Sequence, residues 1–388
     1  MTGVARSTKR RGKRLGRSVL CSFPLLFFGR AFAPTRVQRE SHVLVSRNPL
    51  RTHCVAFSRS GIKYEEEEWA TPQKLCIDTI MNATIDLQGL IFDTRQAYTF
   101  GKWYFKKLHR SIHRPPDRPN FEEAHYISFV HKWQDVFQHI AFDTLPKMKL
   151  ICPYLERHSR INVLVTGKLQ KALLMEVCEL DSIRFKVLKR TLSARKISFP
   201  HFLGSFPMGI MPPGSIKPLN ARATGSQIIY MPRKPGKRAV KNEAALLNLL
   251  NMRYRSALVV YAPTNDWRVD REVFASASVI LGPHGGAFGN IIFAPQRTTV
   301  IEFLSLTQLK RAGKNERPCY FGLATGLGFD YHALEIDGFD FETELFVPLT
   351  KLESLLVLID DSLNRQESYG SSVTHDLERS KLASYKST

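Results

Sequence analysis

The feature that most constrains the fold is a regular alternation of strand-like and helix-like segments between residues 228 and 303. Strands are expected at Ile228–Met231, Ala257–Tyr261, Val279–Leu281 and Thr299–Phe303, and helices at Asn242–Asn251, Val273–Ala277 and Ala287–Phe293. Such alternation is typical of parallel sheets with crossover helices. The sequence therefore predicts an α/β fold.

The first half of the chain shows a related pattern. His125–Phe129 reads as a strand, Lys132–Tyr154 has helical apolar spacing, and Ile161–Val165 reads as a buried strand. Ser198–Pro218 is rich in Pro, Gly and aromatic residues and is expected to cross between two halves. Single cores stop growing at roughly 250–300 residues. We therefore expect two α/β lobes in this chain of 388 residues, at 72–218 and 219–365, and a disordered tail at 366–388.

The front of the chain is strongly basic. Residues 1–60 carry 13 Lys and Arg side chains against the single acid Glu40, out of a net charge of +21 for the whole chain. Ser18–Gly29 is an apolar run followed by Ala31-Phe32-Ala33, which is typical of a secretory signal. A spanning helix needs about 20 apolar residues, so a membrane anchor through residues 18–29 is the less favoured alternative.

These features predict where the protein resides in the cell and whether it binds a metal or a nucleic acid. We expect a signal peptide or short anchor at 1–34, a basic linker at 35–71 and residence in the lumen of the Golgi or endoplasmic reticulum. Import into a plastid is the alternative, because Thr35–Lys63 is basic and nearly free of acids. The six cysteines form no C-x-x-C pair, so no metal site is expected and their pairing stays open. No nucleic-acid partner is expected, because the charge is concentrated in the leader.

A glycine-rich turn lies between the strand at 279–281 and the helix at 287–293. Gly282, Gly285, Gly286 and Gly289 let a backbone approach a ligand closely, and the helix that follows directs N–H groups at the turn. The spacing matches neither the dinucleotide fingerprint nor the phosphate loop of ATPases. The turn is therefore expected either to bind an anion or to serve the fold alone.

Three side chains around this turn suggest a ligand. His284 could donate to a phosphate oxygen, and Asn290 and Glu302 are polar residues within apolar runs. A carboxylate at the end of a buried strand costs several kcal/mol unless it is paired. Glu302 is therefore expected to bind a ribose diol or, alternatively, a lysine or a backbone amide.

His139 and Asp143 form a second candidate pair. They lie four residues apart on an expected helix, so the carboxylate could orient the imidazole as a base. A surface pair with no catalytic role is the alternative. Which of the two would accept a proton stays open.

Several of these motifs together resemble a known family. The segment from Phe274 to Phe303 looks like the signature of family 61 glycosyltransferases. The run from Gln138 to Asp143 resembles the family's H-x-x-x-D helix, and three further stretches agree in order: Arg233 with Arg238, Asn242-Glu243, and Tyr320 through Tyr331-His332. The resemblance spans roughly residues 120–365. Gly286, Phe288 and Gly289 depart from the usual residues, which suggests a looser turn.

The resemblance implies a function and a division of roles. It implies two Rossmann-like domains in a GT-B arrangement, with an acceptor-side N-terminal lobe, a nucleotide-sugar-binding C-terminal lobe and inversion at the sugar. Its implied donor-binding residues are Arg233, Arg238, Gly282, His284, Gly285, Gly286, Asn290 and Glu302, and its implied catalytic residues are His139 and Asp143. The donor is expected to be a UDP-sugar, and the acceptor a hydroxyl of a glycan or glycoprotein.

The chain has no Asp-x-Asp, so neither a metal nor another cofactor is expected, and cationic side chains would stabilise the departing diphosphate. A relative that binds glycans without turnover is the alternative function.

Overall fold

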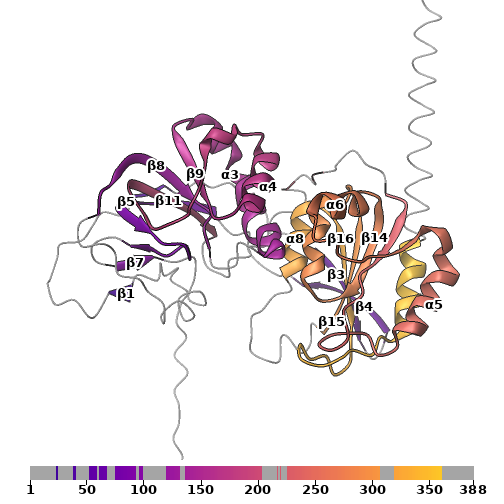
Figure 1. The fold of residues 1–388 in the computed structure, drawn as a ribbon. Helices are drawn as coiled ribbons and strands as arrows, with labels where there is room; N and C mark the ends of the chain where they lie inside the picture. The colour runs from indigo at the N-terminus through magenta and orange to yellow at the C-terminus, as the bar shows by residue number, and fades with distance from the viewer. Residues whose placement is uncertain are drawn as a thin grey trace, which may run out of the picture.

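The structure is a computed structural model that describes residues 23–24, 38–40, 52–58, 61–67, 75–92, 96–98, 119–131, 136–202, 216, 219, 225–305 and 319–360. They form a mixed α/β structure with two sheets, as the alternation predicted (Figure 1). The expected tail at 366–388 and nearly all of the expected leader at 1–34 lie outside the described residues. Among the described residues, no helix is both long and apolar enough to cross a membrane.

The first sheet is mixed rather than wholly parallel. Its main strands, in spatial order, are β5 (Leu75–Ile85), β11 (Leu192–Phe202), β8 (Glu122–Ser128), β9 (Ile161–Val165) and β10 (Phe185–Val187). The last four run parallel, whereas β5 is antiparallel to β11. Four shorter strands extend its β5 side: β1 (Phe23–Pro24), β2 (Gln38–Glu40), β6 (Ile91–Phe92) and β7 (Gln96–Tyr98).

The end of β11 corrects one prediction. Ser198–Phe202, expected to begin the crossing between two halves, continues this strand instead. The buried Ser198 hydroxyl lies 2.7 Å from the Thr79 hydroxyl of β5, and the ladder continues to Phe202. Ser198 and Pro200 made this segment look unlike a strand in the sequence. In the structure β5 supplies both the hydrogen-bond partner of the Ser198 hydroxyl and the neighbouring strand.

The second sheet is the predicted parallel one. Its spatial order is β13 (Leu258–Val260), β12 (Gln227–Tyr230), β14 (Ala277–Pro283), β15 (Thr299–Leu304) and β16 (Asp330–Glu335). Counted along the chain this is the order 2-1-3-4-5 of doubly wound sheets. β14 and β15 are apolar nearly throughout because both faces of the sheet are covered.

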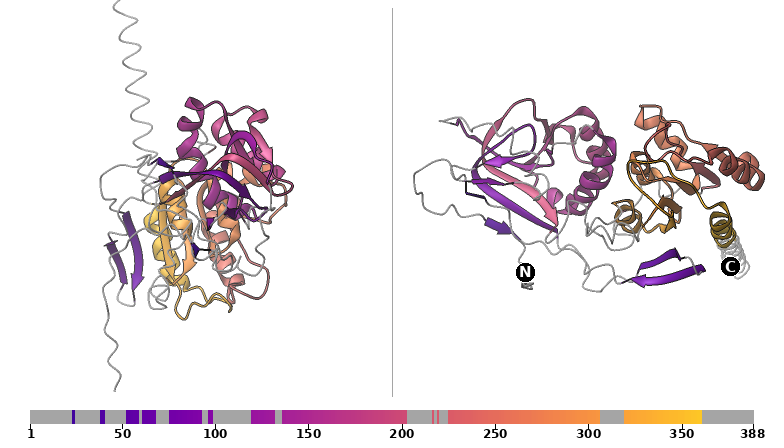
Figure 2. Two further views of the ribbon diagram at one scale, coloured as in Figure 1. Left: turned by 90° about the vertical axis from the view of Figure 1, so that its left-hand side faces the viewer. Right: turned by 90° about the horizontal axis from the view of Figure 1, so that it is seen from below.

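Helices cover both faces of the second sheet. Figure 1 shows α5 (Glu243–Tyr254) on one face, and α6 (Trp267–Ala275) and α8 (Cys319–Leu327) on the face turned toward the first half. Residues 349–360 form a last helix beside α5. The right view of Figure 2 shows the two groups of elements side by side.

Two of these elements differ from the prediction. α6 begins at Trp267 rather than near Val273, because the Asp266 carboxylate accepts from the Arg268 N–H at 2.9 Å and caps the helix. β3 (Thr52–Ser58) pairs with β16, and β4 (Gly61–Glu67) with β3, so that together with β2 three strands lie in the stretch expected to be a linker.

The helix expected at Lys132–Tyr154 contains a π turn. It runs as α2 (Phe137–His139), a π-helical turn η1 (Ile140–Thr144) and α3 (Leu145–Arg157). The Leu145 N–H bonds to the Ile140 carbonyl, five residues back. Pro146 has no N–H to donate and its ring would crowd the carbonyl four residues back, so a wider turn fits this sequence. Such turns are frequent at functional sites.

Apolar packing joins the two halves. The rings of Phe137 and Phe293 stack with centroids 5.7 Å apart, and Trp267 stacks on Phe293 at 6.0 Å. Phe293 ends η4 (Gly286–Phe293), a 3-10 helix where the sequence predicted an ordinary one. A single cluster of buried apolar side chains runs through both halves.

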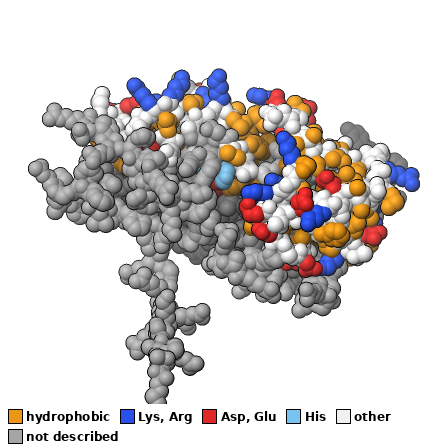
Figure 3. All heavy atoms as spheres, turned by 60° about the horizontal axis from the view of Figure 1, so that its bottom comes forward, with side chains coloured by type: hydrophobic (Ala, Val, Ile, Leu, Met, Phe, Trp, Pro, Cys, Tyr) orange, Lys and Arg blue, Asp and Glu red, His pale blue; other side chains and the backbone are white. Residues whose placement is uncertain are grey.

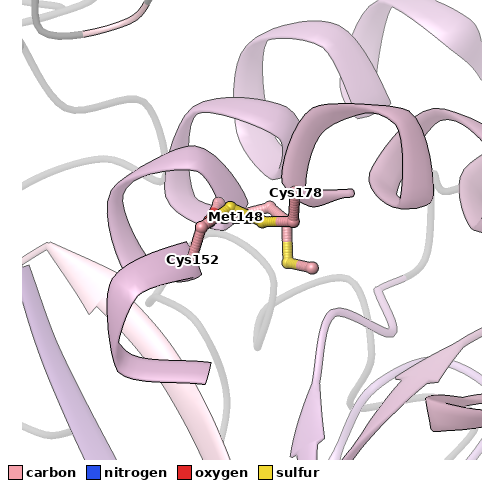
Figure 4. The surroundings of a disulfide bond; sticks show 3 residues. All are labelled: Met148, Cys152 and Cys178. Atoms are coloured by element: carbon pink, nitrogen blue, oxygen red, sulfur yellow. Dashed lines mark hydrogen bonds between the residues drawn. A yellow bond between two sulfur atoms is a disulfide. The ribbon is translucent and has the colours of Figure 1, made fainter. Parts of the chain in front are cut away.

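A disulfide bond joins two helices of the first half. Cys152 of α3 is bonded to Cys178 at the end of α4 (Lys168–Cys178), with their Cα atoms 5.5 Å apart and Met148 beside them (Figure 4). The sequence left this pairing open. The bond fixes the far end of the helix that carries His139 and Asp143.

Removing this bond should destabilise the first half. We expect the double variant Cys152→Ala/Cys178→Ala to lose about 3.5 kcal/mol of unfolding free energy, the chain-entropy value for a loop of this length. Urea denaturation measures the loss. Dithiothreitol should lower the unfolding free energy of the wild type to that of the double variant, and it should leave the unfolding free energy of the double variant unchanged. A reductant that affects both proteins equally would contradict the assignment.

Candidate functional site

The site lies where the order of the second sheet reverses. The chain leaves β12 toward β13 on one side, and β14 lies on the other side of β12. In doubly wound sheets, ligands bind in the crevice at the carboxyl ends of two such strands. Arg233 follows β12 by three residues, and His284 directly follows β14. The sheet order therefore brings these two predicted residues together.

Two arginines converge on one carbonyl oxygen in this crevice. The Nη1 atoms of Arg233 and Arg238 each donate to the His284 carbonyl at 3.1 Å. Within the described part of the chain, neither guanidinium forms an ion pair with a carboxylate, and the buried Nε of Arg238 has no hydrogen-bond partner. Burial and the nearby charge of Arg238 lower the pKa of Arg233. Two guanidinium groups are thus held together with no described carboxylate as a partner.

Arg238 is held in an unusual backbone conformation. Its φ is 62°, in the left-handed region that non-glycine residues seldom adopt. Its N–H donates to the Thr343 carbonyl at 2.6 Å, and its guanidinium lies 5.6 Å from the centre of the Phe341 ring. Conformations of this kind cost about 1–3 kcal/mol and cluster at functional sites. The fold therefore spends stability to position this guanidinium.

Glu302 orients the His284 ring. Glu302 is completely buried, and its Oε1 is hydrogen-bonded to His284 Nδ1. Its Oε2 accepts from the Tyr331 hydroxyl at 2.5 Å. Both carboxylate oxygens are thus occupied by side chains of this protein. This geometry favours an orienting role for Glu302 over contact with a ribose, and it leaves Nε2 as the ring nitrogen of His284 that can face a ligand.

The glycines make close contacts rather than a loose turn. A Cβ on Gly285 would lie 1.9 Å from Arg233 Nη1, and one on Gly286 would lie 1.8 Å from Gln138 Oε1. A Cβ on Gly289 would lie 3.0 Å from the Gln138 Cα. The departures at Gly286 and Gly289 therefore bring the turn against α2 of the first half. A Cβ on Gly282 would meet the Met231 carbonyl at 2.7 Å, so this glycine serves the contact between β14 and the chain leaving β12.

The predicted His139–Asp143 pair is formed. His139 Nδ1 lies 3.0 Å from Asp143 Oδ2, across the π turn. A series of aromatic rings connects the pair to the arginine crevice. The centroid of the Phe142 ring lies 4.9 Å from that of His139 and 5.9 Å from that of Tyr320. The Tyr320 centroid lies 5.5 Å from that of the His284 ring. The His139–Asp143 pair and the two arginines thus border the same junction between the two halves.

A comparison with known families agrees with this arrangement. Residues 137–301 match one family model. That family is glycosyltransferase 61. The match begins at the helix that carries His139 and ends in β15, one residue before Glu302. It confirms the resemblance inferred from the sequence and implies glycosyltransferase activity. No curated protein matches the chain.

One predicted member lies apart from the others within the family 61 segment. Asn290 does not face the arginines; its Nδ2 donates to the Tyr261 hydroxyl at 3.2 Å, and it lines a cavity between the two halves. The predicted donor set is therefore divided between the arginine crevice and this cavity. Among the described residues, no group of three or more His, Cys, Asp or Glu side chains could hold a metal ion.

Two polar residues near the His139–Asp143 pair were missed. Lys147 is buried one helical turn beyond Asp143, whose charge opposes the lowering of the lysine pKa by burial. His131 Nε2 lies 3.2 Å from Thr144 Oγ1, and burial lowers the pKa of His131 to about 4. The spacing of His139, Asp143 and Lys147 at intervals of four could have revealed the lysine. Nothing in the sequence singles out His131.

Two histidines with lowered pKa values, His131 and His332, should make the fold sensitive to acid. Burial lowers the pKa of His131 and of His332 from 6.5 to about 4, so the unfolded chain binds protons first as pH falls. Below 6.5 each histidine should reduce the unfolding free energy by up to about 1.4 kcal/mol per pH unit. Urea denaturation between about pH 7 and about pH 5 measures the slope. His332→Phe should reduce it by about half, and equal slopes would contradict this account.

Proposed function

We propose that the protein is an inverting glycosyltransferase that transfers a sugar from a UDP-sugar to a hydroxyl of a glycan or glycoprotein. The observation that carries the proposal is the pair of arginines, Arg233 and Arg238, which lie at the carboxyl ends of two parallel strands and have no carboxylate partner among the described residues. A diphosphate supplies the missing negative charge. Arginine is well suited to it, because its planar fork of donors matches phosphate oxygens.

The donor diphosphate would lie against Arg233, Arg238 and the Nε2 of His284. As the sugar leaves, negative charge develops on the β-phosphate, and preorganised donors stabilise that charge most strongly in an enclosed site. The hydrogen bond from Glu302 holds the His284 ring in place, so little reorganisation is needed during the reaction.

The acceptor hydroxyl would be activated by His139. Asp143 is buried with a side chain 4% exposed, whereas that of His139 is 20% exposed, so the imidazole is the group that can reach a ligand. With Nδ1–H donating to Asp143, Nε2 takes the hydroxyl proton as the acceptor oxygen attacks the anomeric carbon. The bond from that carbon to the β-phosphate oxygen breaks, its electron pair stays on UDP, and the configuration inverts.

The proposal includes a GT-B arrangement of the two halves. Each half has a sheet with parallel strands and covering helices, and they meet along η4. Donor groups lie on the second half and the candidate base on the first. The division of the chain into lobes at 72–218 and 219–365 is part of this proposal.

Two alternatives are less well supported. A relative that binds glycans without turnover would have no need to keep the His139–Asp143 pair beside an anion site. A nucleic-acid binder would need a basic stripe interleaved with aromatic side chains, but on the face drawn in Figure 3 basic and acidic side chains are interspersed over the second half. The disulfide between Cys152 and Cys178 supports an oxidising address such as the secretory lumen, with plastid import and membrane association through residues 18–29 as the alternatives.

The direct test is a donor screen with the purified full chain. We expect slow hydrolysis of at least one of the nucleotide sugars UDP-xylose, UDP-arabinose and UDP-N-acetylglucosamine. We also expect the protein to bind UDP, as measured by calorimetry. If the protein does not bind UDP, the proposed donor class is rejected, whether or not a UDP-sugar is hydrolysed.

The two halves should contribute separately to binding and turnover. Arg233→Ala and His284→Ala should weaken UDP binding by roughly ten- to a hundred-fold, since each removes about 1.5–3 kcal/mol of charge-assisted hydrogen bonding. Asp143→Asn should leave UDP binding nearly unchanged and reduce turnover by about 10²–10⁴-fold. Arg195→Ala, an exposed arginine of β11, is the matched control. The assignment is wrong if Asp143→Asn abolishes UDP binding while Arg233→Ala preserves it.

Turnover should persist in excess chelator. The chain lacks Asp-x-Asp, and Arg233, Arg238 and His284 are assigned to the diphosphate charge. Initial rates with and without ethylenediaminetetraacetate measure this. Loss of activity that only a divalent metal restores, in a protein that stays folded, would be the contrary result.

A further inference from the structure

A cavity separate from the arginine crevice lies between the two halves. It has a volume of about 850 Å³ and is lined by α2 and α4 on one side and by α6 and η4 on the other. A second hollow of about 1190 Å³ shares four lining residues with it and continues between α4 and α6. Ligand pockets commonly have volumes of about 300–1,000 Å³. The cavity is thus large enough to hold part of a sugar chain, which could enter through the second hollow.

An incomplete hydrogen-bond chain ends at this cavity. Asn290 lines it and is 4% exposed. Its Nδ2 donates to the Tyr261 hydroxyl at 3.2 Å, and burial together with the nearby Asp270 carboxylate raises the pKa of that hydroxyl. Asp270 also accepts from the Thr264 hydroxyl at 2.8 Å.

The order of this chain fixes the orientation of the Asn290 amide. The Asn290 Nδ2 donates to the Tyr261 hydroxyl, and the nearby Asp270 carboxylate, which only accepts, favours a Tyr261 hydrogen directed toward it and away from Asn290. The Oδ1 of Asn290 is then the remaining acceptor, and it has no hydrogen-bond partner among the described residues. A buried acceptor without a donor costs about 1–3 kcal/mol, which a ligand hydroxyl could recover.

The charges around the cavity indicate a neutral ligand. Lys168 and Arg268 are balanced by Asp266 and Asp270. The remaining polar groups of the lining include the amide of Gln138, so donors and acceptors are mixed. This differs from the arginine crevice, where the charge is positive. Hydroxyl groups, which both donate and accept, suit such a lining better than an ion does.

The position of the cavity connects it with the reaction. Gln138 and Gly286 line it, and they lie next to His139 and two residues beyond His284. A chain bound there would approach the His139–Asp143 pair from the side of η4 opposite the arginines.

We propose that this cavity is a carbohydrate-binding subsite that holds neutral sugar residues of the acceptor, with Asn290 Oδ1 accepting from a sugar hydroxyl. The subsite rests on the proposed glycosyl transfer. It assigns Asn290 to the acceptor, in place of the donor-binding role expected from the sequence.

The test measures binding of neutral trisaccharides to the full chain. Xylotriose, arabinotriose and chitotriose are titrated in the presence of UDP and followed by ligand-observed NMR. At least one should bind the wild type. Ala172→Phe, which fills the cavity from the half-buried surface of α4, should weaken that binding at least about ten-fold. Ala244→Phe, on the exposed surface of α5, is the matched control and should bind as the wild type does.

A second variant tests the hydrogen bond. Asn290→Leu keeps a similar volume, and it should weaken trisaccharide binding by roughly two- to tenfold while UDP binds with unchanged affinity. Thermal unfolding checks that this buried substitution leaves the protein folded. If it does not fold, Ala172→Phe decides the question.

The outcomes separate the subsite from the proposed function. Failure of all three trisaccharides to bind, or unchanged binding in Ala172→Phe, overturns the subsite even if UDP binds normally. Loss of UDP affinity in Asn290→Leu by as much as in Arg233→Ala also overturns it and returns Asn290 to the donor site. Absence of UDP binding and of UDP-sugar hydrolysis in the wild type rejects the transferase itself.

Discussion

The close approach of Gly289 to the backbone of Gln138 is the contact on which the site depends. A Cβ on this glycine would stand 3.0 Å from the Gln138 Cα, so any larger residue forces η4 and α2 apart. This contact brings the first turn of the helix with His139 against the turn that follows His284. Stacking of Phe137 on Phe293 holds the same junction from the apolar side. One site is thereby made from two sheets that share no strand.

The charged groups near this junction divide into those that are satisfied and those that are not. Glu302 is fully buried, which would cost several kcal/mol if it were alone, and both its oxygens are hydrogen-bonded within the protein. Arg233 and Arg238 share one carbonyl and no described carboxylate. Among the described residues, the buried acid is neutralised by hydrogen bonds, whereas the two neighbouring cations have no carboxylate partner. This asymmetry supports anion binding more strongly than the glycine-rich turn does.

The sequence predicted what depends on local patterns and missed what depends on distant partners. Parallel strands such as β14 and β15 are apolar runs between turns, and their limits differ from prediction by only a few residues. The strand at Ser198–Phe202 was read as a loop because its polar and Pro residues are matched by β5, more than a hundred residues away. The π turn follows from the position of Pro146, but periodicity alone does not show it. Spacing was enough for His139 and Asp143 because four residues along a helix is a local relation.

Asn290 shows why a motif does not assign a residue to a ligand. It lies six residues after His284, so the sequence groups the two, but they face different surroundings on either side of a short 3-10 helix. Toward His284 the surroundings are two guanidinium groups; toward Asn290 they are amides, a phenol and balanced charges. Positive charge selects a phosphate, whereas mixed neutral donors and acceptors select hydroxyls. The proposed transfer needs both kinds of group near one base, and η4, which places Gly286 against Gln138 and lines the cavity with Asn290, brings both close to the helix that carries His139.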